Sequence, residues 1–185
     1  SSSGNGRRRT AMANAVLISI RPEWAEKILF GKKTLEVRKT RPCLEMPFKC
    51  YIYYTKSAMI GLRGKPGYVV GEFECDKITW LTHIGFTGCP FISLVAMKDR
   101  CTVDNSFNLS DSCLTIGQLE KYLDGKDGYA WHISRLKIYD KPKPLGEFTG
   151  LRATKFGAAS VNLTCPPRSW RYVEEEETEV FPATP

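Results

Sequence analysis

The sequence predicts an α+β fold, in the form of a compact barrel or strongly curved sheet with two short helices. Several short runs are rich in β-branched and aromatic residues and are bounded by turn residues, as strands are. Two other segments have the features of helices: one repeats apolar residues at helical spacing, the other begins like a capping box, and both end with glycine. Several strands with two short helices interspersed among them indicate the α+β class.

The first elements are a strand over Ala15–Ile20 and a helix that begins at Pro22. AVLISI is a short apolar run with valine and isoleucine, and proline suits the first turn of a helix. Apolar residues spaced four apart from Trp24 onward give this helix one apolar face. Gly31 is expected to end it in the left-handed conformation. Residues 34–38 (TLEVR) alternate polar and apolar residues, which predicts a half-buried strand.

The remaining elements follow from composition and spacing. Further strands are expected at residues 50–55, 68–78 and 129–139. A second helix is expected at residues 115–123, where a threonine followed by glutamine three positions later resembles a capping box. Pro142 and Pro144 are expected to end regular structure after the last strand. Residues 79–114 show little periodicity and are expected to form an irregular insert with short elements.

One domain accounts for most of the chain. A length of 185 residues, with 42% hydrophobic and 25% charged residues, suits a single globular domain, expected over residues 12–173. Residues 1–11 (SSSGNGRRRTA) are expected to be a disordered arm or a remnant of cloning, and residues 174–185 an acidic disordered tail. No stretch approaches the roughly 20 apolar residues of a membrane-spanning helix, so no membrane partner is expected.

The cysteines and histidines indicate the compartment and argue against a metal site. Seven cysteines, an odd number without close pairs, fit a reducing and therefore cytoplasmic compartment better than a disulfide framework. The chain has no CxxC motif and only two histidines, so no zinc site is predicted and no cofactor is expected. The sequence does not indicate an oligomeric state.

The charge distribution allows two interpretations. The formal net charge is +7, and setting aside the three arginines of residues 7–9 and five glutamates from residue 174 onward leaves +9 on the body. A body this basic favours a polyanionic partner such as RNA or a nucleotide. A lysine-rich surface that only keeps the protein soluble is the alternative, and charge alone does not separate the two.

Charged groups are concentrated at the corner between the first helix and the next strand. In the segment GKKTLEVR, Gly31 is followed by Lys33, Glu36 and Arg38, and the last two share one strand face. The planar fork of Arg38 suits a phosphate or a base edge, and Glu36 can accept hydrogen bonds from an amine or a sugar hydroxyl. Lys33 suits a phosphate contact or, when desolvated, a general base. The alternative is an ordinary surface strand with a local Glu–Arg pair.

This segment resembles the G-x-K-x-x-E-x-R signature of ASCH domains, in the PUA-like superfamily, of the bacterial or phage type. The segments SIRPEWAEKIL, CYIYYTK, YVVGEFEC and WHISRLKIYDKP surround it in the family's order. The resemblance covers about residues 15–145, with a weaker extension to PPRSWRYVE. It implies a PUA-like β-barrel of five to seven strands with flanking short helices. It also implies a cleft, lined by the signature residues, that binds RNA, a modified base or a nucleotide.

The resemblance leaves open whether the protein is an enzyme. Some small relatives hydrolyse an acetylated cytidine nucleoside with a lysine, a threonine and a glutamate. Lys33 matches the lysine and either Glu72 or Glu74 matches the glutamate, but Glu36 replaces the threonine. A carboxylate cannot serve as a hydroxyl nucleophile, although it can orient Lys33 or activate water. Because another relative cleaves RNA, ribonuclease activity is a further alternative.

Other side chains are candidates for the ligand site, each with a structural alternative. Arg21 and Trp24 begin the helix that leads to the signature, and Trp24 suits either stacking on a base or packing in the core. Around the other strands the candidates are Tyr54, Lys56, Trp131 and His132. A histidine with a purely structural role is the alternative for His132. Recognition of a protein partner is the third functional possibility.

Overall fold

The computed structural model describes residues 14–56, 64–85, 87–88 and 92–176. The expected arm, residues 1–11, lies outside the described residues. The elements of the first half are β1 (Ala15–Ile20), α1 (Pro22–Leu29), β2 (Leu35–Arg38), β3 (Phe48–Tyr54), β4 (Tyr68–Cys75), β5 (Ile78–Gly85) and β6 (Ile92–Met97). Those of the second half are η1 (Leu109–Ser112), α2 (Ile116–Leu123), β7 (Gly128–His132), β8 (Ser134–Pro144), η2 (Leu145–Glu147), β9 (Thr149–Thr154), β10 (Gly157–Asn162) and β11 (Trp170–Val173).

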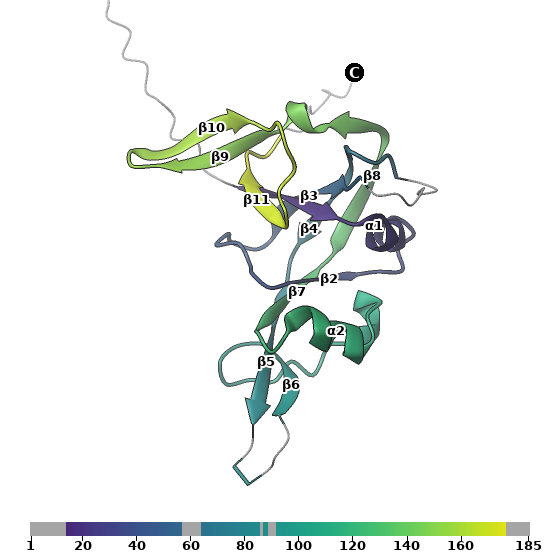
Figure 1. Cartoon of the computed structure of the whole chain (residues 1–185), viewed down its shortest axis with the longest axis vertical. Helices are drawn as coiled ribbons and strands as arrows, with labels where there is room; N and C mark the ends of the chain where they lie inside the picture. The colour runs from purple at the N-terminus through teal and green to yellow at the C-terminus, as the bar shows by residue number, and fades with distance from the viewer. Residues whose placement is uncertain (1–13, 57–63, 86, 89–91, 177–185) are drawn as a thin grey trace, which may run out of the picture.

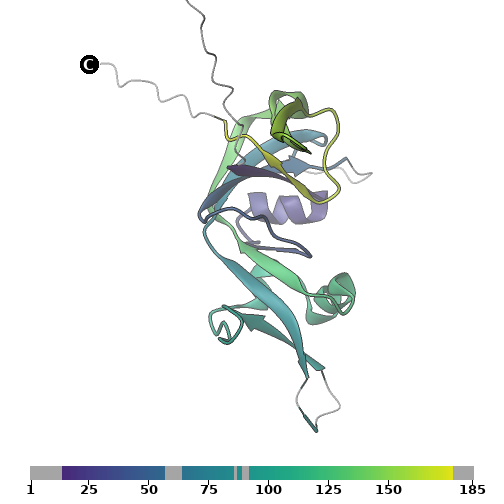
Figure 2. The same cartoon turned by 90° about the vertical axis from the view of Figure 1, so that its left-hand side faces the viewer.

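The described strands form two sheets, which confirms the α+β class. The larger sheet has the order β10-β9-β11-β1-β3-β4-β8, and the smaller has the order β2-β7-β5-β6. Figures 1 and 2 show the two sheets one above the other along the long axis of the molecule. The described structure differs from a barrel of five to seven strands in its strand number and in having no closed barrel. Eleven strands are present among the described residues, and both sheets are open at their edges.

Two long paired strands pass from the larger sheet into the smaller one and connect the two sheets. β4 continues into β5 after Asp76 and Lys77, and β7 continues into β8 after Ile133. β4 pairs with β8 in the larger sheet, and β5 pairs with β7 in the smaller one. The strands expected at residues 68–78 and 129–139 are therefore each divided by a bend. At this bend the backbone N–H of His132 donates to the Lys77 carbonyl, with N and O 2.9 Å apart.

One local expectation was wrong. Pro142 does not interrupt the strand, and β8 ends only at Pro144, because β8 lies at the edge of the larger sheet, where a missing N–H is tolerated. The register between β4 and β8 also shifts around Pro142, which falls in an irregular stretch of the ladder.

The insert expected at residues 79–114 contains the short elements that were expected there, among them β5 and β6, which pair as antiparallel strands from Trp80 to Gly85.

The two helices pack by the apolar faces that their sequences predict. Ala25, Ile28 and Leu29 of α1 are buried in a core cluster with strands of the larger sheet. Leu119 and Leu123 of α2 are buried in a second cluster with β2, β5 and β7. The helices are thereby fixed on either side of β2. No helix among the described residues is long and apolar enough to cross a membrane.

The predicted capping box at the start of α2 is confirmed. The Thr115 hydroxyl accepts a hydrogen bond from the Gln118 N–H at 3.2 Å, and the Gln118 side chain accepts one from the Thr115 N–H at 2.9 Å. Both bonds satisfy N–H groups that a helix start leaves without intrahelical partners.

Replacing the cap is therefore expected to destabilise the domain. The Thr115→Ala variant should lose about 1 kcal/mol of unfolding free energy, measured by urea denaturation. Thr115→Ser, which keeps the hydroxyl, is the matched control and should retain most of the stability. Equal midpoints for the two variants would contradict this role of the hydroxyl.

A buried carboxylate anchors the segment that leads from β6 to η1. Asp104, only 6% exposed, accepts hydrogen bonds from the Thr79 hydroxyl at 2.7 Å and the Ser106 hydroxyl at 2.6 Å. The Lys77 ammonium lies 2.7 Å from Oδ2 of Asp104, the oxygen that also accepts from Thr79. Burial raises the pKa of Asp104, but the hydrogen bonds from Lys77, Ser106 and Thr79 outweigh burial and hold the pKa below the ordinary value.

A carboxyl with a lowered pKa stabilises the fold above its unfolded pKa of about 4 and loses that effect as the pH falls further. Asp104→Asn should therefore cost about 2 kcal/mol at pH 7, and the difference from wild type should shrink below about pH 4. Urea unfolding at the two pH values, with exposed Asp140→Asn as control, measures this. A difference that stays constant with pH would contradict it.

Candidate functional site

The end of α1 brings the signature residues into the body of the protein. Gly31 has a φ of +71°, which glycine adopts without strain, and the N–H groups of Lys32 and Lys33 both donate to the Lys27 carbonyl. The chain then enters β2, which pairs with β7 along its whole length. All four residues of β2 are buried. The interpretation as an ordinary surface strand therefore does not describe this segment.

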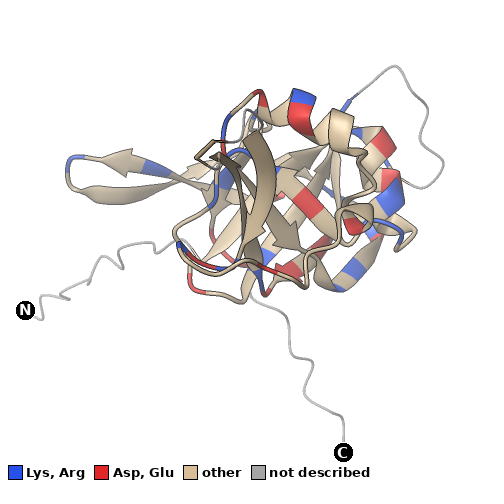
Figure 3. Cartoon of the chain, turned by 90° about the horizontal axis from the view of Figure 1, so that it is seen from below, with Lys and Arg blue, Asp and Glu red and all other residues tan. Residues whose placement is uncertain are grey.

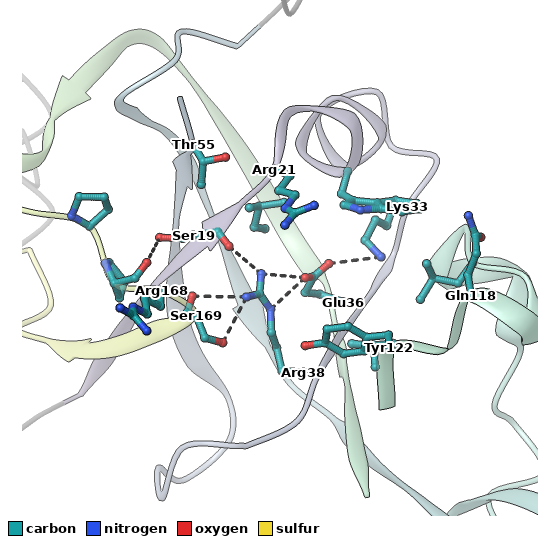
Figure 4. A pocket seen from close by; sticks show the side chains of 16 residues that line it. Ser19, Arg21, Lys33, Glu36, Arg38, Thr55, Gln118, Tyr122, Arg168 and Ser169 are labelled. Atoms are coloured by element: carbon teal, nitrogen blue, oxygen red, sulfur yellow. Dashed lines mark hydrogen bonds and ion pairs between the residues drawn. The ribbon is translucent and has the colours of Figure 1, made fainter. Parts of the chain in front are cut away.

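The carboxylate of Glu36 lies between two cations, as Figure 4 shows. Its Oε2 lies 3.2 Å from the Lys33 ammonium. Its Oε1 lies 2.9 Å from Nη2 of Arg38 and accepts a hydrogen bond from Nε at 3.0 Å. Lys33, Glu36 and Arg38 are 2%, 7% and 9% exposed, so all three charges are largely removed from water. We call this group the charge network.

The charge network joins segments that are distant in the sequence. Nη2 of Arg38 donates to the Ser19 carbonyl of β1 at 2.7 Å, and Nη1 donates to the Ser169 hydroxyl before β11 at 3.2 Å. The Lys33 ammonium donates to the carbonyls of Leu35 and Ser112, both at 2.7 Å. Every nitrogen of the Arg38 guanidinium thus has a protein acceptor, and the three acceptors of Lys33 match the three N–H groups of an ammonium.

An open cleft of about 730 Å³ lies against the charge network. Its walls come from the start of α1, from α2 and from the segment before β11 (Figure 4). The lining residues are Ser19, Ile20, Arg21, Trp24, Lys33, Glu36, Val37, Arg38, Thr55, Leu114, Gln118, Tyr122, Pro166, Pro167, Arg168 and Ser169.

The cleft is positively charged, and two of its cations are free. Four basic side chains and one carboxylate line it, giving a formal charge of +3. Arg21 and Arg168 are exposed, and among the described residues neither guanidinium makes a hydrogen bond or ion pair. Each therefore has its full set of N–H donors available to an anionic ligand. Burial raises the pKa of Tyr122 above its ordinary value, and its phenol can donate a hydrogen bond to a ligand.

The structure brings some of the candidate residues together and separates others. Those that line the cleft are Arg21, Trp24, Lys33, Glu36 and Arg38. Those that lie elsewhere are Gly31, Tyr54, Lys56, Glu72, Glu74, Trp131 and His132. Gly31 shapes the turn but does not reach the cleft, and Lys56 is exposed outside it.

The candidates outside the cleft have other partners. The Tyr54 hydroxyl donates to Glu26 at 2.8 Å, and burial followed by this bond raises the pKa of Tyr54 to about 12. Trp131 is fully buried, with its ring centroid 6.0 Å from that of Phe48. Nδ1 of His132 lies 2.6 Å from Oδ1 of Asp76, beside the bend where the long strands pass from one sheet into the other.

Neither glutamate expected to serve a hydrolase reaches the cleft. Glu72 accepts a hydrogen bond from the Tyr139 hydroxyl and lies 3.8 Å from the Lys49 ammonium. Glu74 lies 3.4 Å from Arg135. The segment after β3 contributes Thr55 to the cleft instead. No group of three potential metal ligands occurs within the described ranges.

Five of the sixteen residues that line the cleft were candidates from the sequence, and two of its walls were missed. Gln118 and Tyr122 are on α2, which was predicted from its capping box without any sign of what its polar side would contact. Arg168 and Ser169 lie in the PPRSW segment, where the resemblance to the family is weaker. The Trp170 ring of this segment lies 5.9 Å from that of Trp131. The prolines that shape this wall were the one available signal.

The structure is similar to solved structures of an ASCH domain, so the chain has the ASCH fold. The match to the crystal structure of ASCH from Zymomonas mobilis has 19% sequence identity and a TM-score of 0.50, and covers 88% of this chain and 89% of that one. A point mutant of the same protein gives the same identity and TM-score, with 88% and 91% covered. No protein-family model and no curated protein matches the sequence.

Arg38 should be irreplaceable by lysine, because one ammonium cannot reach β1, Glu36 and Ser169 together. Arg38→Lys is expected to cost about 3 kcal/mol of unfolding free energy in urea denaturation. The exposed Arg41→Lys is the matched control and should change stability little. If both variants unfold at the same midpoint as wild type, the charge network does not hold these segments together.

Proposed function

We propose that this protein binds RNA, a modified base or a nucleotide in the cleft. The observation that carries the proposal is the pair of free guanidinium groups, Arg21 and Arg168, on an open cleft with a charge of +3. Guanidinium groups bind phosphate through two parallel hydrogen bonds. A volume of about 730 Å³ falls in the range of small-ligand sites and suits one or two nucleotides.

The other lining residues suit a base better than a bare phosphate. Trp24 and Tyr122 offer aromatic surface on opposite helices, and unpaired bases are commonly held on such rings. Gln118 and Thr55 carry amide and hydroxyl groups that can bond to a base edge. Glu36 is fixed by its two cations, so its remaining lone pairs have a constant position for a ligand amine.

Binding is favoured over hydrolysis by the state of the charge network. A hydrolase acting on a modified nucleoside such as acetylcytidine needs Lys33 as a base. The ammonium of Lys33 instead donates to two carbonyls and lies against the Glu36 carboxylate, and these contacts favour the protonated form over a base. Of the three carboxylates considered for that reaction, only Glu36 lines the cleft. No observation specifically favours ribonuclease chemistry.

Removing either free arginine should weaken binding without unfolding the protein. Arg21→Ala and Arg168→Ala are each expected to reduce affinity for a single-stranded RNA of about 12 nucleotides roughly fivefold, and to lower the salt dependence by about 0.7 per lost phosphate contact. Fluorescence anisotropy at several salt concentrations measures both quantities.

The exposed Arg100→Ala, outside the cleft, is the matched control for lost charge and should bind like wild type. Equal affinity of all three variants for RNA and for cytidine monophosphate would contradict the cleft assignment. Turnover of acetylated cytidine or of the RNA, followed by chromatography, would support the enzymatic alternatives instead.

A further inference from the structure

The β9–β10 hairpin extends away from the body of the molecule. Figure 3 shows it as a projecting arm. β10 is at the edge of the larger sheet and pairs only with β9, in a register from Asn162↔Thr149 to Gly157↔Thr154. Six paired residues at a strand rise of about 3.3 Å place the turn roughly 17 Å from the base of the hairpin.

The turn of this hairpin presents an aromatic ring to solvent. Phe156 is 89% exposed, the highest value among the exposed large hydrophobic side chains of the described residues. The turn has a defined structure, because the Thr154 hydroxyl donates to the Gly157 carbonyl at 2.7 Å and accepts from the Phe156 N–H at 3.2 Å. Gly157 has a φ of +115°, which favours glycine.

The charged residues within this segment of the chain are all basic, although the Glu174 carboxylate that follows it accepts a hydrogen bond from the Ser160 hydroxyl of β10. Residues 148–173 contain four arginines and lysines and no aspartate or glutamate, although the chain has 20 acidic residues. Two of the four cations, Arg152 and Lys155, are exposed on the hairpin, and Lys155 Nζ lies 5.2 Å from the Phe156 ring centroid. The arm in Figure 3 accordingly shows blue segments and no red ones.

The same segment forms one wall of the cleft. After β10 the chain continues through buried Leu163 to Arg168 and Ser169, which line the cleft. The base of the hairpin is held by the Arg171 guanidinium, which donates to the Leu151 carbonyl at 3.3 Å. One acid-free segment thus connects a free cleft arginine with an exposed aromatic ring flanked by cations.

We propose that the hairpin is a second contact for a single strand of RNA whose other part occupies the cleft. Phe156 stacks on an unpaired base, and Arg152 and Lys155 contact the neighbouring phosphates. An aromatic side chain beside cations is the combination by which proteins hold single strands without reading their sequence. This inference rests on the proposed function and narrows the ligand to a strand of RNA rather than a free nucleotide.

The test compares a strand with a mononucleotide. Phe156→Ala should weaken binding of a single-stranded RNA of about 12 nucleotides roughly tenfold and leave binding of cytidine monophosphate unchanged. Phe156→Trp keeps a stacking surface and should restore strand binding. Because the ring is almost fully exposed, neither substitution should move the melting temperature, which is measured alongside.

Each outcome separates this inference from the proposed function. Wild-type strand affinity in Phe156→Ala, while Arg168→Ala is weakened, overturns the hairpin contact and leaves the cleft assignment standing. Weakened strand binding in Phe156→Ala with unaffected cleft variants would place the strand on the hairpin alone, which rejects the cleft assignment and overturns a strand that spans both sites. If Phe156→Ala dissociates an oligomer, as seen by sedimentation, and RNA binding is lost together with the oligomer, the hairpin makes a contact between protein copies. That result would overturn the proposal.

Discussion

The carboxylate of Glu36 between Lys33 and Arg38 is the interaction on which the arrangement of the site depends. A charge buried without a partner costs several kcal/mol, so these three side chains must remain together. Arg38 then reaches β1 and the segment before β11, while Lys33 reaches the end of η1. The same contacts fix the positions of the walls of the cleft, and they leave no donor of Arg38 unassigned.

This arrangement separates the cations into two kinds. Lys33 and Arg38 are buried, paired and structural, and they keep Glu36 in one orientation at the floor of the cleft. Arg21 and Arg168 are exposed and have no partner among the residues that the structure describes, and they carry the charge that a phosphate would meet. The signature thus shapes the site, and residues outside the signature supply most of its free binding groups. The acid-free segment from residue 148 to 173 extends that positive surface beyond the cleft.

The sequence predicted what local patterns determine. The strand Ala15–Ile20, the helix from Pro22 and the capping box at Thr115 follow from residue type and spacing alone. The bends at residues 76–77 and 133 were not predictable. The residues before and after each bend are both typical of strands, so composition does not show where a strand passes from one sheet into the other. Gln118, Tyr122 and Arg168 were missed for a related reason. They line the same cleft as Lys33 only because of tertiary packing. They lie about 85 to 135 residues from Lys33 along the chain, and no sequence periodicity extends over such a separation.

The central claim is that RNA enters this cleft with the charge network intact. A nuclear magnetic resonance titration of the isotopically labelled protein with short single-stranded RNA tests it most directly. The largest amide shifts are expected at residues that line the cleft: Arg21, Trp24, Gln118, Tyr122 and Arg168. The Nε proton of Arg38 should exchange slowly with solvent both before and after binding. Shifts centred on Glu72, Glu74 and His132, or no shifts at physiological salt, would contradict it.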